Sequence, residues 1–400
     1  MKTIRTDADL AINGAAPAFE APLHVGRPNI GDRQAFLAYV DQIFERRWLS
    51  NDGPLVQEFE ARVAAHLGVR HCVAMCNGTI ALEIAIRATG MEGEVIVPSY
   101  TFVATAHALQ WQGITPVFAD IDPRTHTLDP DAVRRMITPR TTGIIGVHLW
   151  GRAAPVDALQ ALADEHGLKL VYDSAHAFSC SHGGRMIGHF GNCEVLSFHA
   201  TKFCNSFEGG AVVTNDDALA DRIRLMRNFG FSGLDQVSHP GTNGKMIEIA
   251  AAMGLVNLDA MDRVIGANRT NYEAYRAALA GIPGISLVEY DQAERNNYQY
   301  VIAEVGAGCP ASRDAIVNAL RAERIMARRY FWPGCHRMEP YRSLFPHAGL
   351  MLPHTERVAA SVIVLPTGET MDARRIATVA EVIRVVTGAA NGPPTYEPSS

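Results

Sequence analysis

Lys202 is the only Lys or Arg in the stretch SFHATKFCNSFEGGAVVTND, which spans residues 197–216. Burial lowers the pKa of a lysine amine and frees it as a nucleophile, so a lysine among apolar neighbours can carry an aldehyde cofactor as a Schiff base. Taken alone, Lys202 is as readily explained as a solvated loop residue, because lysines are mostly exposed in folded proteins. The tetrapeptide DSAH at 173–176 favours the first interpretation, because it offers a second contact to such a cofactor.

Asp173 ends the apolar segment LKLVYD, which has the composition of a buried strand. A carboxylate in that place is costly to bury unless a cation or a strong hydrogen-bond donor faces it. The protonated nitrogen of a pyridine ring would be such a partner and would keep the ring electron-withdrawing. Two alternatives stay open: Asp173 caps a helix that begins at Ser174, and His176 is either a support for the carboxylate or a satisfied core histidine.

Gly78 and Thr79 lie in the motif CNGTIAL, where a strand is expected to end and a helix to begin. Free backbone N–H groups and the positive end of the helix dipole make such a place a natural seat for a phosphate group. An ordinary turn capped by Thr79 is the alternative, and the glycine pattern matches neither a Rossmann fingerprint nor a Walker loop. Ser197 is expected to add a hydroxyl to the phosphate. Phe102 either stacks on a planar ring or belongs to the core.

Strand-like segments alternate with helix-like segments through the first half of the chain. Strands joined by crossover helices form a mainly parallel sheet covered on both faces, and such sheets bind ligands at the carboxyl ends of their strands. Gly78, Phe102 and Asp173 all fall at such ends. The expected strands are 71–75, 94–98, 115–119, 142–147 and 169–172, and the expected helices between them are 79–89, 103–112, 129–137 and 155–166.

Two further strands, at 194–198 and 211–214, flank the Lys202 segment. They predict that this segment is a hairpin-like loop at the edge of the sheet. Upstream, apolar residues recur at helical spacing over 32–48, and Asp32 is the expected N-cap of that helix.

The length of 400 residues and the break at Pro283-Gly284 predict two domains. The larger is expected to be α/β and the smaller α+β. The four expected parts are an extended N-terminal arm (1–30), the large domain (31–282), the small C-terminal domain (283–390) and a disordered tail (391–400).

A net charge of −6, with no run of Lys or Arg, argues against a nucleic-acid partner. The seven cysteines form no C-x-x-C pair, which argues against a metal site and favours reduced thiols in a cytoplasmic protein. No stretch approaches the ~20 apolar residues of a membrane span, and the N-terminus lacks the apolar core of a signal peptide. The sequence therefore predicts a cytoplasmic protein without a membrane partner.

The motifs CNGTIAL, VIVPSYTFVATAHA, FADIDP, DSAHAF, SFHATK and EGGAVVTND, in this order, resemble the sugar aminotransferases of the DegT/DnrJ/EryC1/StrS family, which use pyridoxal 5′-phosphate. The resemblance implies an aspartate-aminotransferase-like fold (fold type I), with a large mixed, mainly parallel sheet domain that binds the cofactor and a smaller α+β domain. It also implies a homodimer with shared active sites.

Within the family, the chain looks most similar to enzymes of the desosamine and calicheamicin pathways. These transfer an amino group from L-glutamate to C4 of dTDP-4-keto-6-deoxy-D-glucose, giving dTDP-4-amino-4,6-dideoxy-D-glucose. The segments that carry this similarity are HVGRPN, RWLSNDGPLVQEFE, VHLWGR, SFHATKFCNSFEGG, GTNGKM and RRYFWPGCH.

Carried over residue by residue, the resemblance makes Lys202 the Schiff-base lysine and proton carrier, and Asp173 the partner of the pyridine nitrogen. Phe102 would stack on the ring. The phosphate would be held by Gly78, Thr79, Ser197 and Asn243 of the partner subunit, with His176 lining the pocket. His199 would line the pocket beside the sugar, and Tyr330 and His336 are candidates for contacts to the sugar or nucleotide. Apart from the resemblance, the diphosphate needs cations, and Arg27, Arg328, Arg329 and Lys245 are candidates because they lie in or beside segments interrupted by Gly or Pro. The alternative for each candidate other than His199 is an ordinary solvated surface residue.

Three alternatives remain at this point. A subgroup that aminates C3 has Asn-Leu-Gly after its lysine, where this chain has Glu208-Gly209-Gly210, and this difference favours C4. A dehydratase subgroup has histidine in place of the lysine, against which Lys202 counts. A regulatory protein on the same scaffold would have no need of Lys202 and Asp173. One departure from the family is Asn77, where many relatives have serine before the Gly-Thr pair, so the contribution of residue 77 is left open.

Overall fold

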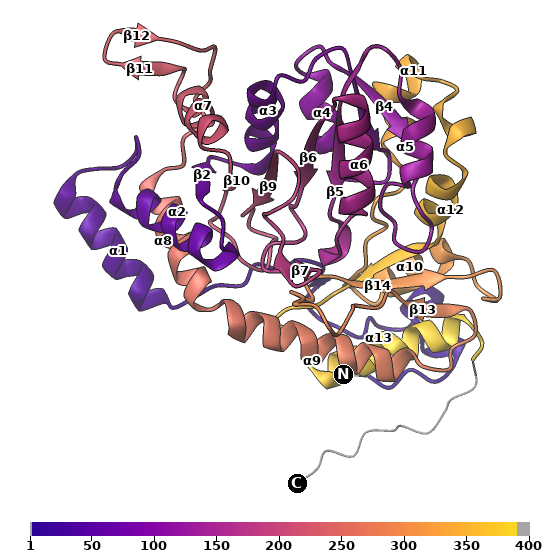
Figure 1. Ribbon diagram of the computed structural model, residues 1–400. Coiled ribbons are helices and arrows are strands. Elements are labelled where there is room, and N and C mark those ends of the chain that lie inside the picture. Colours follow the sequence, from indigo (N-terminus) through magenta and orange to yellow (C-terminus); the bar gives the residue numbers. More distant parts are fainter. Residues whose placement is uncertain (1, 390–400) are drawn as a thin grey trace.

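A seven-stranded sheet forms the centre of the computed structural model, which describes residues 2–389 (Figure 1). The strand order is β2-β10-β9-β6-β5-β3-β4; β10 is antiparallel to both neighbours, and every other neighbouring pair is parallel. The strands are β2 (His71–Met75), β3 (Glu94–Pro98), β4 (Thr115–Ala119), β5 (Thr141–Val147), β6 (Lys169–Asp173), β9 (Cys193–Ser197) and β10 (Gly210–Thr214).

Helices cover both faces of this sheet (Figure 1). Because successive side chains of a strand point to opposite faces, Val95 and Val97 pack with α3 and α4, whereas Ile96 packs on the α5 and α6 side. The helices are α3 (Gly78–Thr89), α4 (Val103–Gln110), α5 (Pro130–Met136), α6 (Val156–His166) and α7 (Asp217–Arg227). The alternation predicted from the sequence is confirmed, with each boundary within two residues.

The position of the Lys202 hairpin differs from the prediction. The segment does join two antiparallel strands, β9 and β10, but neither of them is an edge strand. The first strand of this sheet in chain order, β2, pairs along the free side of β10, with Cys72 opposite Val213. The hairpin-like loop is therefore confirmed and its place at the sheet edge is wrong. Its base is buried between neighbouring strands.

The helix predicted before the sheet is present as α1 (Arg33–Arg46), and Asp32 caps it by accepting the N–H of Ala35 at 2.7 Å. Of its residues only Ile43 is buried, Phe36 packs partly buried against the same core, and Phe44 is 73% exposed, so the predicted apolar stripe is only partly covered. Helices α2 (Pro54–Leu67) and α8 (Glu248–Asp259) pack on the face of β2, β9 and β10 opposite to α3 and α7. Helix α9 (Met261–Leu279) runs from there to a second unit (Figure 1).

The second unit has its own apolar core and a three-stranded antiparallel sheet. Its sheet consists of β13 (Ile285–Leu287), β14 (Val301–Val305) and β16 (Val362–Leu365), and its main helices are α10 (Arg313–Ala322) and α13 (Ala373–Val386). The shorter elements after residue 320 are β15 (Ile325–Met326), α11 (Tyr341–Leu344), α12 (Pro353–Ser361) and the 3₁₀ turns Cys335–Arg337 and Ala348–Met351.

The N-terminal segment packs against this second unit and does not extend away from it. Leu10 and Phe19 are buried in the core of the second unit. The buried carboxylate of Glu323 accepts the N–H groups of Ala11 and Ala18 at 2.6 and 2.7 Å. Strand β1 (Leu23–His24) then pairs with β15.

The remaining elements are small. They are the 3₁₀ turns Asp7–Asp9, Ala11–Asn13 and Leu149–Gly151, the β7–β8 pair (Ser181–His182 and Arg185–Met186) and the β11–β12 pair (Phe231–Gly233 and Gln236–Val237), which projects beside α7 (Figure 1). No helix within residues 2–389 is long and apolar enough to cross a membrane. The tail expected at 391–400 lies outside the described residues.

Candidate active site

Lys202 lies in the β9–β10 loop at the carboxyl end of β9 and is partly buried. Its Nζ is 3.4 Å from the hydroxyl oxygen of Tyr300, which comes from the second unit. Burial lowers the pKa of Lys202 to about 8, and the nearby Asp173 carboxylate opposes this effect without cancelling it. At neutral pH, a larger fraction of the Lys202 amine is therefore neutral and nucleophilic than in an ordinary surface lysine.

Asp173 is the last residue of β6 and is 6% exposed. Its Oδ2 accepts the hydroxyl of Thr105 at 2.8 Å and its Oδ1 accepts the N–H of Ala175 at 3.1 Å. Burial raises the pKa of Asp173, while these hydrogen bonds, and then Lys202 and His148, act in the opposite direction. The chain turns after Asp173 and forms no helix at Ser174, so the helix-cap alternative is wrong.

The expected phosphate-binding position, called the anion seat below, lies where α3 begins at Gly78. Its N-cap is Asn77, whose Oδ1 accepts the N–H of Ile80 at 2.8 Å, so the alternative in which Thr79 is the cap is wrong. The N–H groups of Gly78 and Thr79 are in the first turn, where helix geometry provides no intrahelical acceptor. Ser197, at the end of β9, lies directly beside them: a Cβ on Gly78 would be 3.3 Å from the Ser197 Cβ.

Gly210 allows β10 to approach this seat. A Cβ at residue 210 would lie 2.5 Å from the carbonyl of Asn77 and 2.6 Å from the nitrogen of Gly78, closer than side-chain carbons pack. A larger residue at this position would push the first turn of α3 away from Ser197.

Replacing Gly210 with alanine is expected to destabilise the protein by about 1–3 kcal/mol, the usual range for overpacking a rigid site. Anion binding at the seat should weaken in parallel. Thermal unfolding of the cofactor-free protein and titration with pyridoxal phosphate would measure the two effects. Gly266→Ala is the matched control, since a Cβ there meets no atom within 4 Å and the residue lies in α9. Equal behaviour of the two variants would contradict the close approach.

His176 lies in a group of aromatic rings. Its ring is 4.3 Å from that of Tyr300, 5.5 Å from Trp150 and 5.9 Å from Phe331, measured between centroids. Burial lowers the pKa of His176 well below its usual value, and the charge of Lys202 adds to this. Within residues 2–389 its Nδ1 is buried and has no hydrogen-bond partner. This buried nitrogen is therefore free to hydrogen-bond a polar ligand in this position.

Phe102 is 59% exposed and precedes α4, so the interpretation as a core aromatic is wrong. It stands at the carboxyl edge of the sheet, after β3, as expected of a residue that stacks on a bound ring. Gly26 of the N-terminal segment approaches the same edge, and a Cβ there would be 3.2 Å from Thr201 beside Lys202.

The four residues expected to bind substrate fall into two groups. His199 and Tyr330 adjoin the Lys202 group: His199 Nδ1 is 2.8 Å from the Thr201 hydroxyl, and the Tyr330 ring stacks on Phe331. Arg329 and Lys245 are engaged elsewhere in the chain. The Arg329 guanidinium is 3.1 Å from the Asp314 carboxylate. The Lys245 amine donates to the Asn243 side chain at 2.7 Å and lies 4.6 Å from the centre of the Phe229 ring.

Asn243 is exposed and lies beside the end of the edge strand β2, where Gly244 accepts the N–H of Cys76 at 2.8 Å. His336 is buried, with Nδ1 2.6 Å from the Ser99 hydroxyl and Nε2 2.8 Å from Glu356. Since both ring nitrogens are occupied, His336 supports the loop and offers no free group to a substrate.

Sequence reasoning missed Tyr300, Trp150 and Thr105. Tyr300 lies far from Lys202 in the chain and reaches it only through folding, and Trp150 packs against Tyr300. Thr105 carried a usable signal, because it is the third residue of α4 and its helix starts at the same sheet edge as Asp173.

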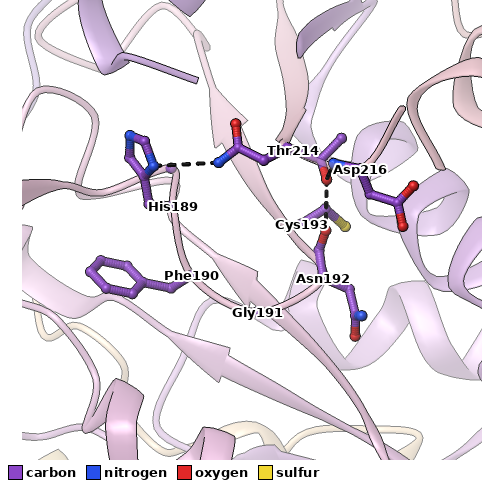
Figure 2. Close-up of a pocket in the computed structure, with 9 residues that line it drawn as sticks. His189, Phe190, Gly191, Asn192, Cys193, Thr214 and Asp216 are labelled. Atoms are coloured by element: carbon purple, nitrogen blue, oxygen red, sulfur yellow. Dashed lines mark hydrogen bonds between the residues drawn. The ribbon is translucent and has the colours of Figure 1, made fainter. Parts of the chain in front are cut away.

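A separate depression of about 200 Å³ lies between the start of β9 and the end of β10 (Figure 2). It is lined by 188–193 and 214–216, and the hydroxyl of Thr214 donates to the carbonyl of Asn192 at 2.8 Å. Ser197 and Gly210 are at the opposite ends of the same two strands. The depression therefore lies at the opposite end of β9 and β10 from Lys202.

The Lys202 group fits a phosphorylated pyridine aldehyde. It combines an amine with a lowered pKa, a buried carboxylate that lacks a full cationic partner, a histidine with an unpaired nitrogen and free N–H groups for an anion. Each feature matches one functional group of pyridoxal phosphate.

Comparison with known proteins agrees with this chemistry. A model of the DegT/DnrJ/EryC1/StrS aminotransferase family matches residues 31–384. The chain is 36% identical over 347 residues to the dTDP-4-amino-4,6-dideoxy-D-glucose transaminase of Shigella dysenteriae, covering 87% of this chain and 94% of that protein. It is 35% identical over 316 residues to the GDP-perosamine synthase of Caulobacter vibrioides, covering 76% and 84% of the two chains.

Among solved structures, that of DesI in the presence of its TDP-sugar product matches with a TM-score of 0.91 and 52% identity, covering 96% of this chain and 97% of that one. The fold is thus the fold type I architecture of pyridoxal-phosphate-dependent transferases, as the resemblance implied. With a family match over most of its length, the chain belongs to the DegT/DnrJ/EryC1/StrS aminotransferase family.

Proposed function

We propose that the protein transfers the amino group of L-glutamate to C4 of dTDP-4-keto-6-deoxy-D-glucose, giving dTDP-4-amino-4,6-dideoxy-D-glucose, with pyridoxal 5′-phosphate as cofactor. The observation that carries this is the pairing of Lys202, whose pKa is lowered to about 8, with the buried Asp173 at the carboxyl edge of the sheet. The name of the Shigella relative supports both the position C4 and the dTDP group. The TDP-sugar product named for the DesI structure also supports the dTDP group.

When bound, the cofactor supplies an aldehyde that takes up the amino group and a ring that withdraws electrons from the carbon losing its proton. Lys202 would move that proton, because its amine has a pKa close to neutral pH and can both accept and donate. Asp173 would hold the proton on the ring nitrogen, since a buried carboxylate favours a cationic partner.

We also propose the remaining cofactor contacts. Gly78 and Thr79 would donate backbone N–H groups to the phosphate and Ser197 its hydroxyl, with Asn243 of the partner subunit completing the seat. Phe102 would cover one face of the ring and exclude water there. The unpaired Nδ1 of His176 would accept or donate a hydrogen bond to a ring substituent in the pocket.

For the nucleotide sugar we propose contacts from both groups of residues described above. His199 and Tyr330 adjoin Lys202 and would orient the sugar. A diphosphate requires cations, and Arg329 and Lys245 are exposed enough to exchange their present partners for it.

A homodimer is part of the proposal. Supporting it, large apolar side chains are exposed on α1 and on the β11–β12 hairpin, for example Phe44 at 73% and Leu234 at 97% exposure. Sedimentation or light scattering would show a monomer in solution if these side chains did not form a dimer interface. We also propose the division into an N-terminal segment (1–30), a large cofactor domain (31–282) and a small domain (283–390), and a reducing, cytoplasmic setting for the free cysteines.

Pyridoxal phosphate is expected to react with the cofactor-free protein at a rate that rises with pH and levels off above about 8, the lowered pKa of Lys202. Below that pH the amine is protonated and cannot attack the aldehyde; above it the nucleophile is fully formed. Stopped-flow absorbance over a pH series would measure the rate. A rise that continued towards 10.5, the ordinary lysine value, would contradict the effect of burial.

The proposed function is tested by incubating the protein with L-glutamate and a panel of 3-keto and 4-keto sugars on dTDP, GDP and UDP, followed by NMR of the products. Amination at C4 of the dTDP sugar is expected. Amination at C3 alone would overturn the position, and preference for another nucleotide would overturn the substrate. A protein that stayed colourless with pyridoxal phosphate would favour a non-catalytic binding role.

A further inference from the structure

A second buried carboxylate, Glu194, lies next to Asp173 in the sheet. Strands β6 and β9 are neighbours, with Tyr172 opposite Glu194 and Asp173 opposite Val195. Glu194 is fully buried, and its Oε1 accepts the N–H groups of Gly188 and Phe190 at 2.7 and 2.8 Å. Donors of this kind offset the desolvation of a carboxylate, so Glu194 is held firmly in one place.

Ser174 connects Glu194 to the active site. This residue directly follows Asp173, and its hydroxyl donates to Oε2 of Glu194 at 2.5 Å. The Ser174 N–H also donates to the carbonyl of Val195 at 2.8 Å. The turn that aims the Asp173 carboxylate is thus fastened to β9 through both the backbone and the side chain of Ser174.

His148 packs against Glu194 and is bonded to the end of β6. Its ring is fully buried and stacks on Tyr172 at 4.5 Å between centroids. Its Nδ1 accepts the N–H of Ala154 at 2.9 Å, and its Nε2 lies 3.3 Å from Oε2 of Glu194 but forms no hydrogen bond within residues 2–389. The backbone N–H of His148 donates to the carbonyl of Asp173 at 3.0 Å.

We propose that Glu194 is a positioning residue for Asp173. It touches neither Lys202 nor the proposed cofactor position, but it fixes the Ser174 hydroxyl by a hydrogen bond and packs beside His148. Ser174 directly follows Asp173, and the N–H of His148 donates to the Asp173 carbonyl. Removing its charge would let the turn after Asp173 shift, and a carboxylate moved by a fraction of an ångström loses much of its interaction with a ring nitrogen. This inference rests on the proposed role of Asp173.

Glu194→Gln tests the inference, and Glu323→Gln is the matched control. Glu323 is also fully buried and also accepts two backbone N–H groups, from Ala11 and Ala18, but it lies in the second unit. Both variants are expected to melt at a lower temperature. Only Glu194→Gln is expected to raise the dissociation constant for pyridoxal phosphate, by about tenfold or more, the effect of losing one hydrogen bond to a charged group.

Two further measurements distinguish positioning from general destabilisation. The absorbance of the bound cofactor as a function of pH is expected to shift for Glu194→Gln and to stay unchanged for Glu323→Gln. Ser174→Ala, which removes a single hydroxyl, is expected to give a smaller effect in the same direction and serves if Glu194→Gln does not fold. Equal cofactor affinity in Glu194→Gln and Glu323→Gln, or in Ser174→Ala and the unmodified protein, would overturn the inference. Failure of the unmodified protein to bind pyridoxal phosphate would instead overturn the proposed function.

Discussion

Replacing Lys202 with alanine is expected to lower turnover by at least about 10²–10⁴-fold, the usual contribution of a positioned general acid/base. The variant loses both the covalent attachment point and the group that moves the proton. It keeps Asp173 and the anion seat, so it should retain some pyridoxal phosphate non-covalently. Turnover with glutamate and the keto sugar, together with borohydride trapping and mapping of the modified peptide, would measure the two effects.

Lys169→Ala is the control for this experiment. Lys169 is exposed and begins the same strand, β6, that Asp173 ends, so it lies at the opposite edge of the sheet. It should leave both turnover and trapping unchanged. Wild-type turnover in Lys202→Ala, or trapping of the cofactor on another lysine, would refute the assignment of Lys202.

Replacing Asp173 with asparagine is expected to lower turnover on the order of 100-fold or more, in line with the loss of one preorganised charged contact in a buried site. The side chain keeps its shape and an acceptor for the Thr105 hydroxyl, but no longer favours a proton on the ring nitrogen. The cofactor's absorption spectrum and its dependence on pH should change together with turnover.

Asp120→Asn is a close match for this change. Asp120 is also buried at the carboxyl end of a strand, following β4, and accepts the N–H and hydroxyl of Thr355 at 2.8 Å. It should cost stability, because α12 begins beside it, but leave the cofactor spectrum as it is. If the two variants changed the spectrum alike, Asp173 would have no special relation to the ring.

The sequence was sufficient to predict the sheet and the residues at its carboxyl edge. Strands buried on both faces are short apolar segments; Asp173 ends one of them, β6, and Gly78 follows another, β2, after two residues. Since all carboxyl ends of parallel strands meet at one edge, strand boundaries alone placed these residues together.

What the sequence did not predict depends on contacts between distant segments. No local pattern states that β2 pairs with β10, and so the Lys202 hairpin was placed at the edge. The contact of Tyr300 with Lys202 joins two units of the fold and has no sequence spacing to reveal it. The choice of Asn77 over Thr79 as helix cap was a shift of two residues, which is within the uncertainty of helix boundaries.

The attachment of the N-terminal segment to Glu323 has a consequence for the order in which the protein is made. Strand β10 completes the large sheet once residue 214 has emerged, but Ala11 and Ala18 must wait for a carboxylate more than 300 residues later in the chain. Contacts so far apart in sequence form late, because the loop they close is long. Gly26 follows this segment and lies against Thr201, next to Lys202. We therefore expect the contact between the N-terminal segment and the loop that carries the reactive lysine to form among the last steps of folding.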